Sequence, residues 1–179
     1  MDYPIIKTER LTLRQITFDD SAAVFAYRSD TVSNRYQGWI PKTKDDTEDW
    51  IDKIASSFNQ ADSWAQFAII LNSSGELIGD IGLHFLDEHQ VELGCTLAKT
   101  NQGQGYATEA LSSCIKYLFK SLYKHRIITS IDPRNTASIN LVKRLGFRQE
   151  AHFKQSILQN DQWLDDLVFA LLKSEYNSY

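Results

Sequence analysis

The feature that most constrains this chain is a glycine-containing loop between a predicted strand and a predicted helix. Residues 90–97 favour a strand, and residues 100–110 then carry two glycines, Gly103 and Gly105. Glycine permits positive φ, and the first N–H groups of a helix are unpaired and carry partial positive charge. The loop therefore predicts a phosphate or pyrophosphate site built from main-chain N–H groups. The helix is predicted because apolar residues recur at helical spacing: Ala107, Ala110, Leu111, Cys114, Ile115, Leu118 and Leu122.

The loop is not specific by itself. It lacks the Gly-Lys-Ser/Thr of a Walker A site, and Thr108 stands where the dinucleotide-binding fingerprint has its third glycine. It matches Gln/Arg-x-x-Gly-x-Gly/Ala through Gln102, Gly105 and Ala107. The alternative is an ordinary left-handed turn before a helix.

A second motif follows a predicted strand at residues 126–131. Asn135 is a good N-cap, and Gly146, in Leu145-Gly146-Phe147, stands where a helix ends in a left-handed conformation. With both motifs in this order, the chain resembles the GNAT superfamily of acetyl-CoA-dependent N-acetyltransferases. The resemblance covers nearly the whole chain and is sharpest over residues 77–147.

This resemblance implies a fold, a cosubstrate and a set of binding residues. The fold would be α/β, one domain over residues 1–179, with a mixed, mostly antiparallel sheet flanked by helices and with strands splayed at the acetyl-CoA site. A main-chain N–H near residues 94–97 would stabilise the oxyanion. The residues expected to bind acetyl-CoA are Leu97, Gln102, Gly103, Gln104, Gly105, Tyr106, Ala107, Thr108, Asn135 and Ser138.

Hydrophobic patterning predicts the remaining elements. Strands are expected at residues 11–15, 66–71, 77–85, 148–156 and 163–172, the last two as a closing hairpin. Helices are expected to begin at residues 17–20 and to span about residues 45–59, with Trp50, Ile51, Ile54 and Phe58 on one face.

Glu92 is the best acid–base candidate, since it lies on the strand that enters the loop. It is expected either to take the amine proton or to orient the acceptor. Many GNAT members carry a tyrosine seven residues after the asparagine, and here that position is Val142. The departure resembles the branch that acetylates N-termini of ribosomal proteins, in which a serine three residues after the asparagine, here Ser138, faces the thiol. The alternative for Asn135 and Ser138 is a capping contact alone.

The acceptor wall is expected from the loop at residues 35–41, with Tyr36, Trp39 and Glu92 binding the substrate; simple packing is the alternative for the two aromatic residues. Asp161, Asp165 and Asp166 either contact a cationic acceptor or lie on a solvated hairpin. The histidines show no metal-ligand spacing, so no metal is expected.

Composition narrows the function classes. The net charge of −4 over 179 residues does not suggest a nucleic-acid partner. Cys95 and Cys114 form no disulfide or metal pattern, and no apolar run suggests a signal peptide or a membrane span, so a cytoplasmic location is expected. A homodimer is compatible with the resemblance.

These observations predict transfer of an acetyl group from acetyl-CoA to a primary amine. The preferred acceptor is the N-terminal α-amine of a ribosomal protein or peptide. The alternatives are a small amine (a polyamine, an amino acid or an aminoglycoside) and a non-catalytic acyl-CoA-binding module.

Overall fold

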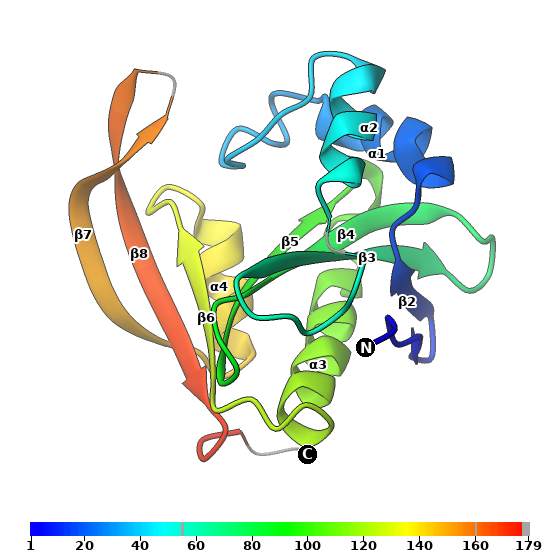
Figure 1. Cartoon of the computed structure of the whole chain (residues 1–179). Coiled ribbons are helices and arrows are strands. Elements are labelled where there is room, and N and C mark those ends of the chain that lie inside the picture. The colour runs from blue at the N-terminus through cyan, green and yellow to red at the C-terminus, as the bar shows by residue number, and fades with distance from the viewer. Residues whose placement is uncertain (55, 160, 177–179) are drawn as a thin grey trace.

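The described residues of this computed structural model, 1–54, 56–159 and 161–176, form one eight-stranded sheet (Figure 1). The strand order is β1-β2-β3-β4-β5-β6-β8-β7, and β5 and β6 are the one parallel pair. The sheet is therefore mixed and mostly antiparallel, as predicted. The strands are β1 (Ile6–Lys7), β2 (Leu11–Gln15), β3 (Ser63–Leu71), β4 (Leu77–Phe85), β5 (Gln90–Leu97), β6 (Arg126–Ile131), β7 (Arg148–Gln159) and β8 (Gln162–Leu172).

Helices cover both faces of the sheet, and the alternation of side chains along β3 separates the two layers. Phe67 and Ile69 pack into the cluster that contains α3 and α4, whereas Ala68 packs against α1 on the other face. The β7–β8 hairpin projects beyond the rest of the sheet (Figure 1). The helices are α1 (Ser21–Arg28), α2 (Lys44–Asp52), α3 (Tyr106–Lys120) and α4 (Thr136–Arg144), with short 3-10 turns η1 (Phe18–Asp20) and η2 (Lys99–Asn101).

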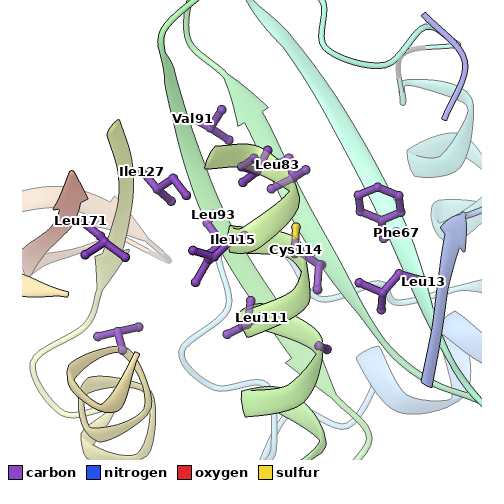
Figure 2. Packing of buried hydrophobic residues seen from close by; sticks show 14 of the residues in the cluster. Leu13, Phe67, Leu83, Val91, Leu93, Leu111, Cys114, Ile115, Ile127 and Leu171 are labelled. Atoms are coloured by element: carbon purple, nitrogen blue, oxygen red, sulfur yellow. The ribbon is translucent and has the colours of Figure 1, made fainter. Parts of the chain in front are cut away.

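The main core lies between α3 and the middle of the sheet. Leu111, Cys114 and Ile115 of α3 point at the strands, as Figure 2 shows, and all three are buried. Cys114 is a core residue with no exposed surface, and burial raises the pKa of its thiol to about 12. Because α3 is fixed along its length, the glycine loop that precedes it has a rigid support.

The parallel pair β5–β6 separates partway along its length. Pairing runs from Gln90 opposite Arg126 to Glu92 opposite Ile128. Beyond that point β5 continues to Leu97, and β6 continues to Ile131 beside β8. The predicted splay of these two strands is therefore present, and it opens the sheet in front of α3 and α4.

Two boundaries differ from the predictions. The helix expected over residues 45–59 ends at Asp52, and Asn59 has a positive φ of 59°. Serine and asparagine compete for backbone hydrogen bonds and end helices readily, which accounts for the early stop. Phe58 consequently leaves the predicted face and packs in the main core, whereas Trp50 and Ile54 pack on the opposite side of the sheet.

The other differences are small. The short edge strand β1 was not predicted, and the two strands of the closing hairpin are longer than expected. Asn72 to Gly75 form the turn between β3 and β4, with Gly75 at φ 72°. No helix in the described part of the chain is long and apolar enough to cross a membrane.

Candidate active site

Three adjoining cavities cross the sheet where β5 and β6 separate. Tyr36, Gln37 and Cys95 line all three of them. The first cavity, which we call the acceptor cavity, has a volume of about 570 Å³ and opens between α2 and the β7–β8 hairpin. The second, of about 110 Å³, lies at the splay, and the third, of about 820 Å³, lies against the glycine loop and α4. A ligand on one side of the sheet can therefore meet a ligand on the other.

The third cavity is lined by most of the residues that the sequence predicts to bind acetyl-CoA, and after that prediction we call it the coenzyme A cavity. Gln104 is the exception: its side chain donates to Thr100 O at 3.0 Å and lies outside the lining. The predicted residues that do line this cavity are Leu97, Gln102, Gly103, Gly105, Tyr106, Ala107, Thr108, Asn135 and Ser138.

The glycine loop has the backbone that an anion site requires. Gly103 and Gly105 have φ values of 76° and 83°, and Gly105 is the N-cap of α3. The amide of Glu109 donates to Gly105 O at 3.1 Å, which makes it the first bonded amide of the helix. The amides of Tyr106, Ala107 and Thr108 make no hydrogen bond to any described residue, so they are available to a phosphate oxygen.

A partly exposed ion pair between Arg10 and Glu109 supports this loop from the outside of the molecule. Glu109 accepts hydrogen bonds from Thr8 Oγ1 at 2.6 Å, from the Arg10 amide at 2.9 Å and from Arg10 Nε at 2.6 Å. Arg10 also donates to Gln104 O at 3.0 Å and covers the Tyr106 ring. Partial burial opposes a low pKa for Glu109, but these hydrogen bonds outweigh it and lower the pKa. No pattern in the sequence links residues so far apart.

Asn135 and Ser138 lie at the start of α4, facing the splay. Asn135 Oδ1 accepts from the Ser138 amide at 3.1 Å, so the predicted N-cap is present. This cap uses neither Asn135 Nδ2 nor Ser138 Oγ, and neither atom bonds to another described residue. Both residues line the second and third cavities, and capping is therefore compatible with a contact to a ligand.

Glu92 lies at the last position where β5 still pairs with β6. Its side chain is 33% exposed and lines the acceptor cavity. Its cross-strand neighbour on β4 is His84, whose Nδ1 is 3.8 Å from Glu92 Oε2. His84 is in turn stacked on Trp64 with ring centroids 4.5 Å apart.

Aromatic side chains form the wall of the acceptor cavity. Trp39 and Trp50 are stacked with centroids 5.1 Å apart, and both line it together with Tyr36 and Trp64. The loop with Tyr36 and Trp39 is joined to the hairpin by a hydrogen bond of 2.8 Å from Gln159 Nε2 to Gln37 O. Tyr36 and Trp39, which the sequence predicted to bind the substrate, therefore belong to a loop that is packed against the domain and also line the acceptor cavity.

The carboxylates that line the acceptor cavity differ in their partners. Asp132 is paired with Arg134, and Asp165 is paired with His152 and Lys154. The hydrogen bonds from Lys154, the Gln155 amide and His152 lower the pKa of Asp165 strongly. Among the described residues, Glu92 is the carboxylate of this lining without an arginine or lysine partner. Of the other hairpin acids, Asp166 is buried and accepts from Ser130 Oγ.

A buried polar cluster lies at the floor of the same cavity. Asp80 on β4 accepts hydrogen bonds from Tyr27 Oη, from Gln66 Nε2 and from two nitrogens of Arg28. Burial raises the pKa of Tyr27 far above its ordinary value, with the Asp80 charge as the second cause. Burial lowers the pKa of Arg28, but the charge and hydrogen bonds of Asp80 outweigh it and raise the pKa. The sequence signal for this cluster is Asp80 in the middle of the strand 77–85, where both of its neighbours are apolar or glycine.

Cys95 lines the passage between the cavities. Burial raises the pKa of its thiol far above the ordinary value, with the Asp80 charge as a second cause. The thiol therefore stays protonated and is a poor nucleophile. Within the described ranges, no group of three or more His, Cys, Asp or Glu side chains is placed to hold a metal ion.

Comparisons with known proteins agree with this geometry. The family described as acetyltransferase (GNAT) domain matches residues 10–148. Uncharacterized N-acetyltransferase YnaD of Bacillus subtilis (strain 168) is 34% identical over 176 residues, which are 96% of this chain and 99% of that protein. An acetyltransferase (GNAT family) from Bacillus anthracis has a crystal structure that matches with a TM-score of 0.87 and 33% identity, over 96% of this chain and 100% of that one.

Two further matches name an acceptor. Ribosomal protein uS5-alanine N-acetyltransferase of Escherichia coli (strain K12) is 34% identical over 88 residues, which are 49% of this chain and 45% of that protein. Spermidine N-acetyltransferase from Vibrio cholerae, solved with CoA and spermine, has a TM-score of 0.81 at 22% identity, covering 94% of this chain and 99% of that one. The second likeness shows the shared fold alone.

The chain therefore belongs to the GNAT family of acetyltransferases. It is an acetyl-CoA-dependent N-acetyltransferase, as the two sequence motifs predicted.

Proposed function

We propose that this N-acetyltransferase acts on the N-terminal α-amino group of a protein or peptide, in the manner of the enzymes that modify ribosomal proteins. The observation that carries the proposal is the position of Glu92, the carboxylate of the acceptor cavity that no arginine or lysine neutralises among the described residues. A single carboxylate without an arginine or lysine partner suits one ammonium group. The partial match to the uS5-alanine enzyme supports the same class of acceptor.

The acidity of the acceptor favours an α-amine. An α-amino group has a pKa of about 7.7–8.0, whereas a lysine side chain has a pKa of about 10.4. A useful fraction of α-amines is therefore neutral near pH 7. A site with one partly exposed glutamate, and with Val142 in place of a tyrosine, is better matched to such an acceptor than to lysine.

The proposed roles follow the order of the reaction. Glu92 accepts the proton of the attacking amine, directly or through one water molecule. A main-chain N–H of β5, near residues 94–97, donates to the oxyanion. Ser138 Oγ, which has no partner among the described residues, donates a hydrogen bond to the departing thiolate. Serine is too weak an acid to supply the proton itself at rest.

The residues of the coenzyme A cavity fit acetyl-CoA. The free amides of Tyr106, Ala107 and Thr108 offer donors to a pyrophosphate, and the N-terminus of α3 adds favourable charge. Lys99 and Arg144 add cationic side chains to the same lining. Asn135 Nδ2 is available to an amide carbonyl of the pantetheine arm.

The first test is a thiol-release assay with acetyl-CoA and a panel of acceptors. We expect turnover with basic peptides that have a free N-terminus and none with the same peptides blocked by an N-formyl group, which is the matched control. Turnover with spermidine alone would favour the small-amine alternative. Tight coenzyme A binding without turnover on any acceptor would favour the non-catalytic alternative.

A further inference from the structure

The geometry points to Arg28 as the residue that recognises an oxygen atom next to the reacting amine. We infer that the preferred acceptor is an α-aminoacyl group, in which the amine and a carbonyl share one carbon. This inference rests on the proposed function and adds to it a second recognition element. Glu92 would meet the amine of the acceptor, and Arg28 would meet the oxygen atom beside it.

Arg28 ends α1 at the floor of the acceptor cavity and is only 8% exposed. Two of its nitrogens are committed to Asp80: Nε lies 2.9 Å from Oδ2, and Nη2 lies 2.5 Å from Oδ1. The third nitrogen, Nη1, makes no hydrogen bond to any described residue. Nη1 is not fully enclosed by protein atoms. Because Arg28 lines the acceptor cavity, a group inside that cavity can reach it.

The guanidinium cannot easily turn away from the cavity. Its central carbon lies 5.0 Å from the Trp50 ring and 5.8 Å from the Trp39 ring, and both rings line the same cavity. Asp80 is itself held by Tyr27 and Gln66. The plane of Arg28 is therefore fixed before any acceptor arrives, which favours selective recognition.

A buried cationic donor favours an acceptor that satisfies it. A carbonyl or carboxylate oxygen beside the amine would accept a charge-assisted hydrogen bond from Nη1. A protonated polyamine has only N–H donors, so it would leave Nη1 without water and without a partner, next to a like charge. Lys53, the other cation of the lining, is exposed and meets such an acceptor only at the rim.

The test compares two acceptors on two variants. Arg28→Lys keeps a cation beside Asp80 but removes the Nη1 donor. We expect kcat/KM for an Ala-initiated peptide to fall roughly tenfold or more, and kcat/KM for spermidine to change by less than about threefold. Tyr27→Phe is the matched comparison: it removes a hydrogen bond to Asp80 but keeps the Nη1 donor of Arg28, so we expect it to change the ratio of the two values by less than Arg28→Lys does.

A second comparison needs no substitution. It tests whether the enzyme recognises the carbonyl beside the amine even if Arg28→Lys does not fold. The wild-type enzyme is given the same peptide with its first carbonyl replaced by a methylene, with rates expressed per neutral amine. We expect kcat/KM to fall roughly tenfold. Equal kcat/KM values for the two peptides would overturn the role of Arg28 but not the proposed function. An equal fall in kcat/KM for the peptide and for spermidine in Arg28→Lys, with coenzyme A affinity intact, would have the same meaning. Wild-type turnover of spermidine with none of the peptide would overturn the proposed function as well.

Discussion

The two sides of the active site are built in different ways. The lining of the coenzyme A side comes from three local segments, residues 32–37, 95–108 and 135–144, and its free donors are largely main-chain amides at the start of α3. The acceptor side takes side chains from α1, α2, β3, β4, β5, β8 and the loop after α1. Some of its charges are paired between those elements, such as Arg28 with Asp80, whereas Glu92 has no arginine or lysine partner among the described residues.

This difference teaches where specificity can change. A site made of backbone tolerates changes in side chains but depends on a few glycines and caps. A site made of side chains from many elements changes its ligand with single substitutions. We therefore expect substitutions on the acceptor side to alter turnover and acceptor choice, and those on the coenzyme A side to alter cosubstrate affinity or stability.

Glu92→Gln should produce the largest effect. If Glu92 accepts the amine proton, kcat should fall about 100-fold or more, the usual scale for a positioned base. Coenzyme A affinity should stay unchanged, because Glu92 does not line the coenzyme A cavity. Steady-state kinetics measure this, with Glu88→Gln in the exposed β4–β5 turn as the control. A rise in the acceptor KM with unchanged kcat would show that Glu92 binds the acceptor instead.

Gly105→Val should weaken coenzyme A binding by more than about 1.4 kcal/mol, a factor of roughly ten. Valine is strained at the observed φ of 83°, and its Cβ would lie 3.4 Å from Arg10 Nη2, so we expect the loop and the free amides that follow it to shift. Isothermal calorimetry measures the affinity. Gly75→Val is the matched control, since Gly75 has φ 72° in a turn outside the coenzyme A cavity. Unchanged affinity in a folded Gly105→Val variant would contradict the assignment of the loop.

Glu109→Gln should lower stability rather than turnover. Because Arg10 is partly exposed, we expect a loss of about 1 kcal/mol and a fall in Tm of about 2–4 °C at neutral pH. The folded-state pKa of Glu109 is depressed, so its contribution is present above the ordinary value of 4.5 and is lost as the pH falls through the lower folded value. Thermal melts of both proteins should converge at acid pH. A constant gap in Tm from pH 7 to pH 3 would rule out this ion pair as the cause.

Gln159→Ala should give the smallest effect. It removes the 2.8 Å hydrogen bond between the hairpin and the Tyr36 loop at the mouth of the acceptor cavity. We expect the acceptor KM to rise about twofold, the low end for a neutral hydrogen bond near water. Gln162→Ala, on the exposed start of β8, serves as the control. A change in coenzyme A affinity of similar size would remove the distinction between the two sides.

The sequence predicted the backbone conformation of the coenzyme A side well because its signals are local. Gly105 and Gly146 predict a positive φ, and Asn135 predicts a helix N-cap. All three residues adopt the predicted conformation. The alternation along residues 90–97 predicted β5 for the same reason. Roles for the residues on this side, such as Ser138, stay predictions that the experiments above address.

The acceptor side was only partly predictable because its contacts join distant segments. Arg28 and Asp80 are 52 positions apart, and Gln37 and Gln159 are 122 apart. No periodicity connects such pairs. The helix predicted over residues 45–59 failed for a related reason, since Phe58 is drawn into the aromatic cluster of Tyr3, Phe67 and Phe85. This tertiary packing acts together with the serine and asparagine residues that favour an early end of the helix.

The central claim is transfer of an acetyl group to an N-terminal α-amine, and one measurement tests it most directly. A basic peptide with a free N-terminus and internal lysines is incubated with acetyl-CoA and the enzyme, and fragmentation mass spectrometry locates the added group. The protein's net charge of −4 favours such a peptide at low salt. We predict a single acetyl group on the N-terminal residue, with the lysines unmodified. Acetylation confined to lysine side chains, or found only on spermidine in a parallel reaction, would contradict the account.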